Sequence, residues 1–143
     1  MTPERVSLIT LGVADMERAR AFYAALGWNA LPSPPEVSFY QMDGMVFGLF
    51  GLDALAHDQG RPGAELGFGA VTLAQNFPSR EDVDAAFAKA IDAGATALKT
   101  PQEVFWGGYS GYYADPDGHV WEMAHNPFWE IDEKGRITVP DGP

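Results

Sequence analysis

Cysteine is absent from this chain of 143 residues. Its absence excludes disulfide bonds, thiolate metal sites and a thiol nucleophile. The sequence also has no apolar run that approaches the roughly 18 residues of a membrane-spanning helix. No apolar segment follows a basic stretch near the N-terminus. These absences predict a cytoplasmic protein without a membrane partner.

Basic residues are scarce, because 9 Lys and Arg residues stand against 20 Asp and Glu residues and give a net charge of −11. Such a charge opposes binding to the phosphates of nucleic acids, so we expect no nucleic-acid partner. The apolar fraction of 46% and the aromatic fraction of 13% are typical of a globular protein. The length suits one domain with its own core, over residues 1–143.

Hydrophobic periodicity and turn residues predict one strand, one helix and two further strands in the first part of the chain. We expect these elements over residues 6–13, between Asp15 and Gly27, and over residues 37–42 and 45–50. Asp15 is a suitable N-cap and Gly27 a suitable stop for the helix. Residues 52–67 contain Gly and Pro and are expected to form a linker loop.

The same order of elements repeats in the second part of the chain. We expect a strand over residues 70–77, a helix between Ser79 and Gly94, and strands over residues 96–99, 103–106, 109–114 and 120–124. The sequence therefore predicts an α+β fold of two βαβββ modules with mixed sheets. Module one covers residues 5–51 and module two residues 68–126, followed by a tail over residues 127–143. Each helix covers one face of its sheet, and the opposite faces are free to enclose a cup-shaped cavity.

The last hairpin carries the residue of greatest chemical interest. Asp115-Pro116-Asp117-Gly118 has the residue preferences of a type I turn. On the strand that follows, Glu122 shares a face with Val120 and Ala124, while Trp121 and Met123 point to the other face. A strand with bulky apolar residues on one face and a lone acid on the other indicates a helix-packed side and a cavity side.

These segments resemble the vicinal oxygen chelate superfamily, the glyoxalase, bleomycin-resistance and extradiol dioxygenase group. The resemblance rests on the strand ITLGV, the helix end FYAALGW and the hairpin DPDGHVWE, and it covers roughly residues 5–126. It implies paired βαβββ modules that each cup an open cavity, and a homodimer is the common assembly. Whether the modules pair within one chain or across two subunits stays open.

In metal-dependent members of this group, a His on the first strand, a His on the first strand of module two and a Glu on the last strand bind the metal. The matching positions here hold Leu8, Thr72 and Glu122. Leucine has no lone pair to donate, and a threonine hydroxyl is a poor ligand for metals that favour imidazole. We therefore expect no cofactor, with a divalent metal bound through Glu122 as the alternative.

The three histidines of the chain do not restore this site. His119 lies in the hairpin turn, where an exposed side chain is expected, and His125 has the wrong parity to face the cavity with Glu122. His57 lies in the expected linker and would reach the cavity only if that loop folds over its mouth.

Other residues are candidates for a ligand-binding surface. Ser110 and Tyr112 share a strand face, and Tyr112 matches the position of a substrate-contacting tyrosine in the related fosfomycin-resistance proteins. Gly107 and Gly108 lack side chains and would let a ligand approach the backbone. The full set of candidate ligand-binding residues is Trp106, Tyr109, Ser110, Tyr112, Thr72, Leu8, Phe39 and Phe47. For each aromatic member, ordinary core packing is the competing interpretation.

These observations favour a protein that binds a small aromatic or amphipathic molecule in a cavity without a complete metal site. The alternative is a divalent-metal-dependent lyase, isomerase or dioxygenase that uses Glu122 as a ligand. A third hypothesis is metal-free catalysis, in which Glu122 acts as a general base because burial in an aromatic cavity favours the protonated carboxyl. In that case Tyr112 would donate a hydrogen bond to the substrate.

Overall fold

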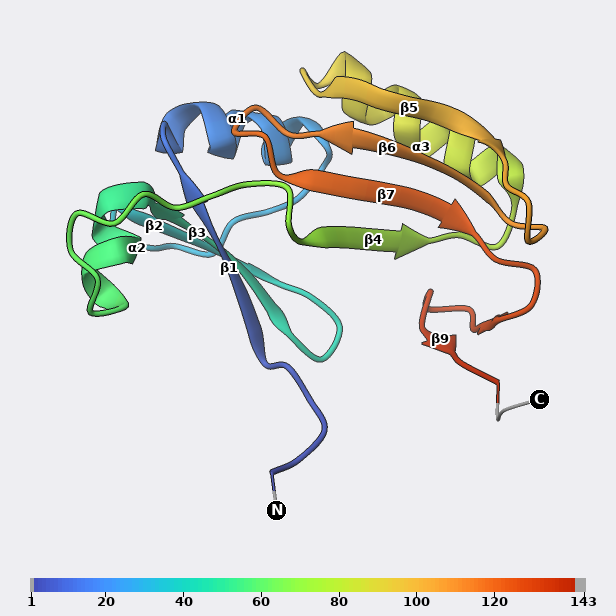
Figure 1. The fold of residues 1–143 in the computed structure, drawn as a ribbon, viewed down its shortest axis with the longest axis horizontal. Helices are drawn as coiled ribbons and strands as arrows, with labels where there is room; N and C mark the ends of the chain where they lie inside the picture. The colour runs from blue at the N-terminus through green and yellow to red at the C-terminus, as the bar shows by residue number, and fades with distance from the viewer. Residues whose placement is uncertain (1, 141–143) are drawn as a thin grey trace. The chain divides into compact units, whose positions relative to one another are not determined.

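A computed structural model describes residues 2–140 of the chain. The chain divides into two compact units, the first ending at Gly67 and the second beginning at Phe68. The first unit combines two helices and the second unit one helix with a sheet of mixed strand direction (Figure 1), which confirms the predicted fold class. No helix within the described residues has both the length and the apolar character needed to cross a membrane.

The first unit contains five elements in the order strand, helix, strand, strand, helix. They are β1 (Leu8–Val13), α1 (Met16–Ala25), β2 (Val37–Gln41), β3 (Val46–Gly51) and α2 (Leu52–Asp58). The sheet has the order β1-β3-β2, with β1 parallel and β2 antiparallel to β3. The predicted strands and the first helix are confirmed. The three strands of the unit are those that the residue ranges predict, and its sheet is one strand short of a full βαβββ module.

The proline-rich segment before β2 explains the missing fourth strand. Proline has no N–H to donate to a strand ladder, so a run from Pro32 to Pro35 cannot extend the sheet. The Leu31 amide donates to the Phe39 carbonyl at 2.8 Å. Instead of pairing as a strand, the segment is held to α1 by Arg20, whose guanidinium donates to the carbonyls of Pro35 and Val37 at 3.0 and 2.8 Å.

The core of the first unit lies between α1 and the sheet. The Asp15 side chain accepts a hydrogen bond from the Arg18 amide at 3.1 Å and caps α1 as predicted. The buried residues of this helix are Ala19, Phe22 and Tyr23. The Tyr23 ring packs against the rings of Trp28 and Phe47, with centroids 5.2 and 5.1 Å apart. This aromatic packing fixes one face of the sheet as the helix-packed side.

The expected linker contains a helix, so the prediction of a loop over residues 52–67 is wrong for the α2 residues. A Cβ atom on Gly12 of β1 would lie 2.7 Å from the Leu52 side chain and 3.2 Å from that of Leu55. The apolar side chains of α2 therefore pack directly on the β1 backbone, where Gly12 leaves the space that they fill. Gly12 has the opposite parity to buried Leu11 and Val13, so α2 covers part of the sheet face away from α1.

The second unit has the order of a βαβββ module, with one strand fewer after the helix than the predicted residue ranges contain. Its elements are β4 (Thr72–Asn76), α3 (Arg80–Asp92), β5 (Thr96–Glu103), β6 (Tyr109–Ala114) and β7 (Val120–His125). The sheet order is β4-β7-β6-β5, with β4 parallel to β7 and the other pairs antiparallel. The two short strands predicted over residues 96–99 and 103–106 are corrected to the single strand β5. A turn follows it, in which the Gly107 amide donates to the Val104 carbonyl at 2.9 Å.

Helix α3 lies behind the sheet of the second unit in the view of Figure 1. The Ser79 side chain caps this helix by accepting from the Asp82 amide at 3.1 Å. Phe87 of α3 contacts Tyr113, whose ring is stacked on that of Trp121 with centroids 6.5 Å apart. Trp121 and Met123 are buried. The predicted division of β7 into a helix-packed face and an opposite face is confirmed.

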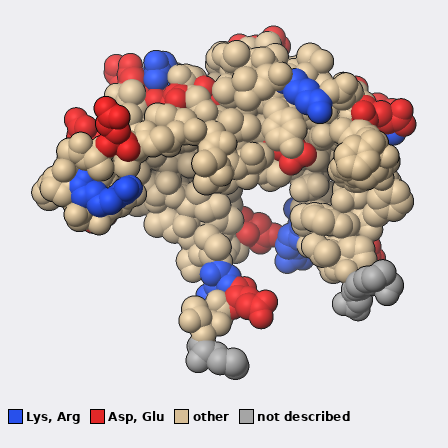
Figure 2. Space-filling view, in the orientation of Figure 1, with Lys and Arg blue, Asp and Glu red and all other residues tan. Residues whose placement is uncertain are grey.

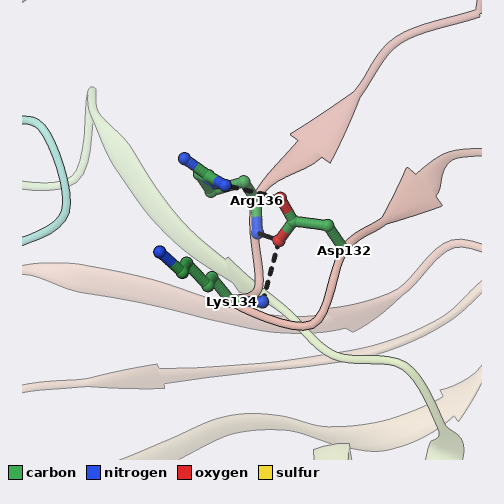
Figure 3. Close-up of polar contacts among 3 residues, drawn as sticks. All are labelled: Asp132, Lys134 and Arg136. Carbon is green, nitrogen blue, oxygen red and sulfur yellow. Dashed lines mark hydrogen bonds and ion pairs between the residues drawn. The ribbon is translucent and has the colours of Figure 1, made fainter.

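The residues after β7 form a small hairpin of β8 (Glu130–Ile131) and β9 (Ile137–Thr138). Its turn is organised by Asp132, whose Oδ1 accepts from the amides of Lys134 and Arg136 at 2.9 Å each (Figure 3). The hairpin is preceded by Phe128, whose ring would lie 3.1 Å from a Cβ atom on Gly107. The tail is thereby packed on the turn between β5 and β6.

Candidate functional site

The sheet of the second unit has one face away from α3, which we call the open face. Strand register places the members of this face opposite one another on neighbouring strands. Its residues are Thr72, Ala74, Asn76, Thr96, Lys99, Gln102, Ser110, Tyr112, Ala114, Val120, Glu122 and Ala124. Most of these side chains are small or neutral, and Glu122 lies near the middle of the face.

Tyr112 and Glu122 stand directly opposite each other on β6 and β7. Burial raises the pKa of the Tyr112 phenol above its ordinary value, and the negative charge of Glu122 and hydrogen bonding to its carboxylate raise it further. The phenol therefore keeps its proton at neutral pH and can donate a hydrogen bond. The two side chains together offer an acceptor and a donor at one point of the open face.

Two further predicted residues share this face with Glu122. Ser110 is buried and stands opposite Ala124, one position along each strand face from the Tyr112–Glu122 pair. Thr72 stands opposite Val120, so it lies diagonally from Glu122 rather than directly beside it. Ala74 is the residue of β4 that pairs with Glu122. The predicted shared face of Ser110 and Tyr112 agrees with this register.

Tyr109 lies on the opposite face and is not brought together with Glu122. Its hydroxyl donates to Asp84 of α3 at 2.6 Å, and the Arg80 guanidinium lies 5.1 Å from the centre of its ring. The same arginine forms an ion pair with Glu103 at 2.9 Å. Tyr109 is thus a polar link between β6 and α3, and its placement does not support the predicted contact with a ligand in the cavity.

Trp106 lies in the turn between β5 and β6 and is 43% exposed. Its indole ring occupies the space into which a side chain on Gly108 would project. The two glycines were expected to open the backbone to a ligand, but Trp106 fills the space at one and Phe128 packs against the other. The glycines are explained by this internal packing.

In the first unit, Leu8 and Phe39 are neighbours on the sheet face away from α1. A Cβ atom on Gly48 would lie 3.2 Å from the Phe39 ring and 3.5 Å from the Leu8 side chain. Phe47 points to the other face and is 2% exposed within the aromatic core against Tyr23. The two candidates Phe39 and Phe47 therefore lie on opposite faces of the sheet, because Phe39 pairs with Gly48 and the adjacent Phe47 faces the opposite way.

The histidines are dispersed. His57 is exposed near the end of α2. The His119 ring lies 4.8 Å from that of Phe68, which partly covers it, so the expectation of a fully exposed side chain is corrected. His125 shares the α3 side of β7 with Trp121 and Met123, and its Nδ1 lies 2.9 Å from the Phe77 carbonyl oxygen. The predicted orientation of His125 away from Glu122 is confirmed.

The donor set does not fit a divalent metal of the kind that the family implies. Within residues 2–140, no group of three or more His, Cys, Asp or Glu side chains is arranged to hold a metal ion. Glu122 is the one carboxylate of the open face, and its nearest neighbours across the strands are Ala74 and Tyr112. A single carboxylate with a hydroxyl does not meet the preference of such metals for imidazole or several carboxylates.

One residue of the open face was missed by sequence reasoning. Lys99 pairs with Tyr112 from the other side, so Tyr112 stands between Lys99 and Glu122. The signal that could have found it is Pro101, because a proline inside a strand pattern marks an edge strand or a bulge. That irregularity shifts the parity at Lys99, and the register shift between Ala97 and Lys99 shifts it back, so a regular alternation places Lys99 on the wrong face.

Comparison with known proteins gives a consistent result for the whole fold. A sequence profile described as the Glyoxalase/Bleomycin resistance protein/Dioxygenase superfamily matches residues 5–123. A glyoxalase-related enzyme from Fulvimarina pelagi is 35% identical, with 97% of this chain and 100% of that chain covered and a TM-score of 0.89. A glyoxalase/bleomycin resistance protein/dioxygenase family enzyme from Burkholderia phytofirmans shares the fold, with a TM-score of 0.71 at 23% identity over 83% of this chain and 96% of that chain.

Two curated relatives match a shorter segment of this chain. An uncharacterized protein of Mycobacterium bovis is 45% identical over 43 residues, which are 30% of this chain and 28% of that protein. An uncharacterized protein of Mycobacterium tuberculosis matches with the same identity and covers 25% of its own length. The match therefore spans less than a third of these relatives.

Proposed function

Because the chain belongs to the Glyoxalase/Bleomycin resistance protein/Dioxygenase superfamily, we propose that it binds a small aromatic or amphipathic molecule on the open face, without a complete metal site. The observation that carries this proposal is the direct pairing of Tyr112 with Glu122. A neutral phenol and a carboxylate side by side recognise a polar group of a ligand as donor and acceptor.

The surroundings of this pair suit the apolar part of such a molecule. The neighbours of Tyr112 and Glu122 on the open face include Ala74, Ala114, Val120 and Ala124. These side chains are short, so an aromatic frame can lie flat against the sheet beside the Tyr112 ring. Ligand sites commonly combine an apolar lining with a few polar groups that fix orientation.

Catalysis on the same face is a second candidate, favoured by the pairing of Tyr112 with Glu122 across β6 and β7. The relative from Fulvimarina pelagi is described as a glyoxalase-related enzyme. Glu122 would take a proton from a carbon beside a carbonyl group, and Tyr112 would donate to the carbonyl oxygen as negative charge develops there. Deuterium exchange at the α-carbon of phenylacetone tests this step. An exchange rate that is equal with wild type and Glu122→Gln would contradict it.

The binding proposal is tested by titrating the full chain with indole, a neutral aromatic molecule with one N–H donor, and following amide NMR signals. We expect saturable changes that centre on residues of β6 and β7 next to Tyr112 and Glu122. Glu122→Gln and Tyr112→Phe should each weaken binding. Asp84→Asn is the matched control, because this acid also pairs with a tyrosine but lies on the α3 side of the sheet.

Two results would overturn the binding proposal. One is the absence of saturable binding at millimolar indole. The other is a set of changes that centre on the aromatic residues of the β5–β6 turn, such as Phe105 and Trp106, and leave the signals near Glu122 unmoved. Phe105 is fully exposed and Trp106 partly exposed, so this turn is the competing apolar surface of the second unit.

A further inference from the structure

An irregularity in β5 decides which of its side chains reach the open face. Ala97 pairs with Tyr113, but the next residue of β6, Tyr112, pairs with Lys99 rather than with Leu98. One extra residue on one strand is a β-bulge, which can re-aim a side chain relative to its neighbours. In a regular strand Leu98 would stand opposite Tyr112. The bulge places Lys99 there instead.

A second register shift of β5, between Lys99 and Gln102, is matched by a glycine on the neighbouring strand. A Cβ atom on Gly111 of β6 would lie 2.7 Å from the backbone nitrogen of Pro101 and 2.8 Å from the carbonyl oxygen of Lys99. Only glycine leaves room for this close approach of the two backbones. Pro101 has no N–H to leave unpaired at the irregular position. The chemistry of both strands therefore supports the placement of Lys99.

Lys99, Tyr112 and Glu122 form a row across three adjacent strands, which we call the charge row. Neighbouring strands lie about 4.8 Å apart, so the backbones at the two ends of the row are about 10 Å apart. The rows on either side carry neutral side chains, namely Thr72, Val120, Ala114 and Thr96 in one and Asn76, Ala124, Ser110 and Gln102 in the other. Figure 2 views this face, with a basic side chain over β5 and an acidic group over β7.

The cation of the charge row, Lys99, has no side-chain partner among residues 2–140. Lys99 is exposed and forms no ion pair or hydrogen bond through its side chain with the residues that the structure describes. The two arginines of the second unit are engaged, since Arg80 pairs with Glu103 and Arg136 pairs with Asp132. An ammonium group that is not neutralised by the protein is available to an anionic group of a ligand.

We propose that the charge row makes the open face selective for zwitterionic aromatic molecules, with Lys99 binding the carboxylate of the ligand and Glu122 its ammonium group. This inference rests on the proposed function, because it names the ligand class for the same face. The Tyr112 ring lies between the two charges and contacts the aromatic frame. The net charge of −11 repels a simple anion at long range, whereas a zwitterion carries no net charge.

Three compounds with one aromatic frame test this selectivity. They are para-aminomethylphenylacetate, which carries both charges, para-methylphenylacetate, which lacks the ammonium group, and para-methylbenzylamine, which lacks the carboxylate. Affinities are measured by amide NMR titration of the full chain as wild type, Lys99→Gln and Glu122→Gln. Lys89→Gln is the matched control, because this lysine is exposed on α3 at the other face of the sheet.

We expect the zwitterion to bind wild type about two- to fivefold more tightly than either singly charged compound, as is usual for an exposed ion pair. Lys99→Gln should remove the advantage over para-methylbenzylamine and preserve the advantage over para-methylphenylacetate. Glu122→Gln should remove the advantage over para-methylphenylacetate and preserve the advantage over para-methylbenzylamine. Lys89→Gln should change neither advantage. Added salt should reduce both advantages, because exposed charges are screened.

Two outcomes separate this inference from the function on which it rests. If the compounds bind at the open face but Lys99→Gln weakens all three equally, or if wild type does not prefer the zwitterion, the selectivity is wrong and the binding face stands. If indole and all three compounds leave the signals of β6 and β7 unmoved, the binding face itself is wrong.

Discussion

Tyr112 stands directly opposite Glu122 on the neighbouring strand, and burial together with the Glu122 carboxylate raises the pKa of its phenol above the ordinary value. A folded-state pKa above the unfolded one favours the protonated phenol. The associated stability is fully present below the unfolded pKa and is lost as the pH rises through the folded one. The pKa of Tyr112 therefore reports whether Tyr112 and Glu122 are paired on the open face.

We expect Glu122→Gln to lower the pKa of Tyr112 toward its ordinary value, because the substitution removes the negative charge that opposes phenolate formation. The part of the shift that comes from burial should persist. Alkaline titration followed by NMR of labelled tyrosine ring carbons measures the change. Asp84→Asn is the control, since Asp84 raises the pKa of Tyr109 through a hydrogen bond and should move that tyrosine alone. A Tyr112 titration that is identical in wild type and Glu122→Gln would refute the interaction.

Gly111→Ala should destabilise the second unit by about 1–3 kcal/mol, the usual cost of overpacking a site that cannot relax. The added methyl group would meet the backbones of Pro101 and Lys99 within 2.8 Å. Urea denaturation measures the loss. Gly51→Ala is the matched control, because Gly51 also lies in a strand and a Cβ atom there would meet nothing within 4 Å. Equal stability of the two variants would show that the β5 bulge does not depend on Gly111.

The alternation of side chains along β7 could be predicted from the sequence because it depends only on the period of a regular strand. Trp121 and Met123 face α3 and Glu122 faces away, as the pattern required. The ends of the helices could also be predicted from the sequence, because an Asp or Ser cap and a terminal glycine act within one turn of the backbone. Asp15 and Ser79 both accept the expected capping hydrogen bonds.

Features that depend on the pairing of strands could not be predicted from the period of a single strand. Phe39 and Phe47 are both ligand-binding candidates in the sequence, yet the register of β2 against β3 puts them on opposite faces. Lys99 was missed because a bulge changes parity inside a strand without altering its composition. Strand register is a tertiary property, fixed by burial and by neighbouring backbones, and local periodicity does not contain it.

Phe39 and Phe47 of the first unit make a direct comparison. Phe47→Ala should cost about 3–5 kcal/mol of stability, because it leaves a cavity in a core where the ring packs against Tyr23 and Trp28. Phe39→Ala should cost clearly less, since Phe39 is only half-buried and lies on the sheet face away from α1. Thermal or urea unfolding of both variants measures the difference. A larger loss for Phe39→Ala would contradict the assignment of the two faces.

The turn between β8 and β9 should loosen in acid because of Asp132. The hydrogen bond from the Arg136 amide is the leading cause that lowers the pKa of this carboxyl, and the Arg136 side chain and the Lys134 amide also contribute (Figure 3). A depressed folded-state pKa gives stability that is present above the unfolded value and is lost as the pH falls through the folded value. The amide signals of Lys134 and Arg136 should therefore shift together in acid, below the ordinary Asp pKa.

Asp132→Asn should produce weaker hydrogen bonds at neutral pH, because a neutral amide oxygen is a poorer acceptor than a carboxylate. Faster hydrogen exchange of the Lys134 and Arg136 amides would report this change. Glu133→Gln is the matched control, since Glu133 lies in the same turn and its side chain accepts no hydrogen bond from the residues described. If both variants exchange alike, the turn is held by the Gly135 backbone conformation, φ 82°, rather than by the Asp132 carboxylate.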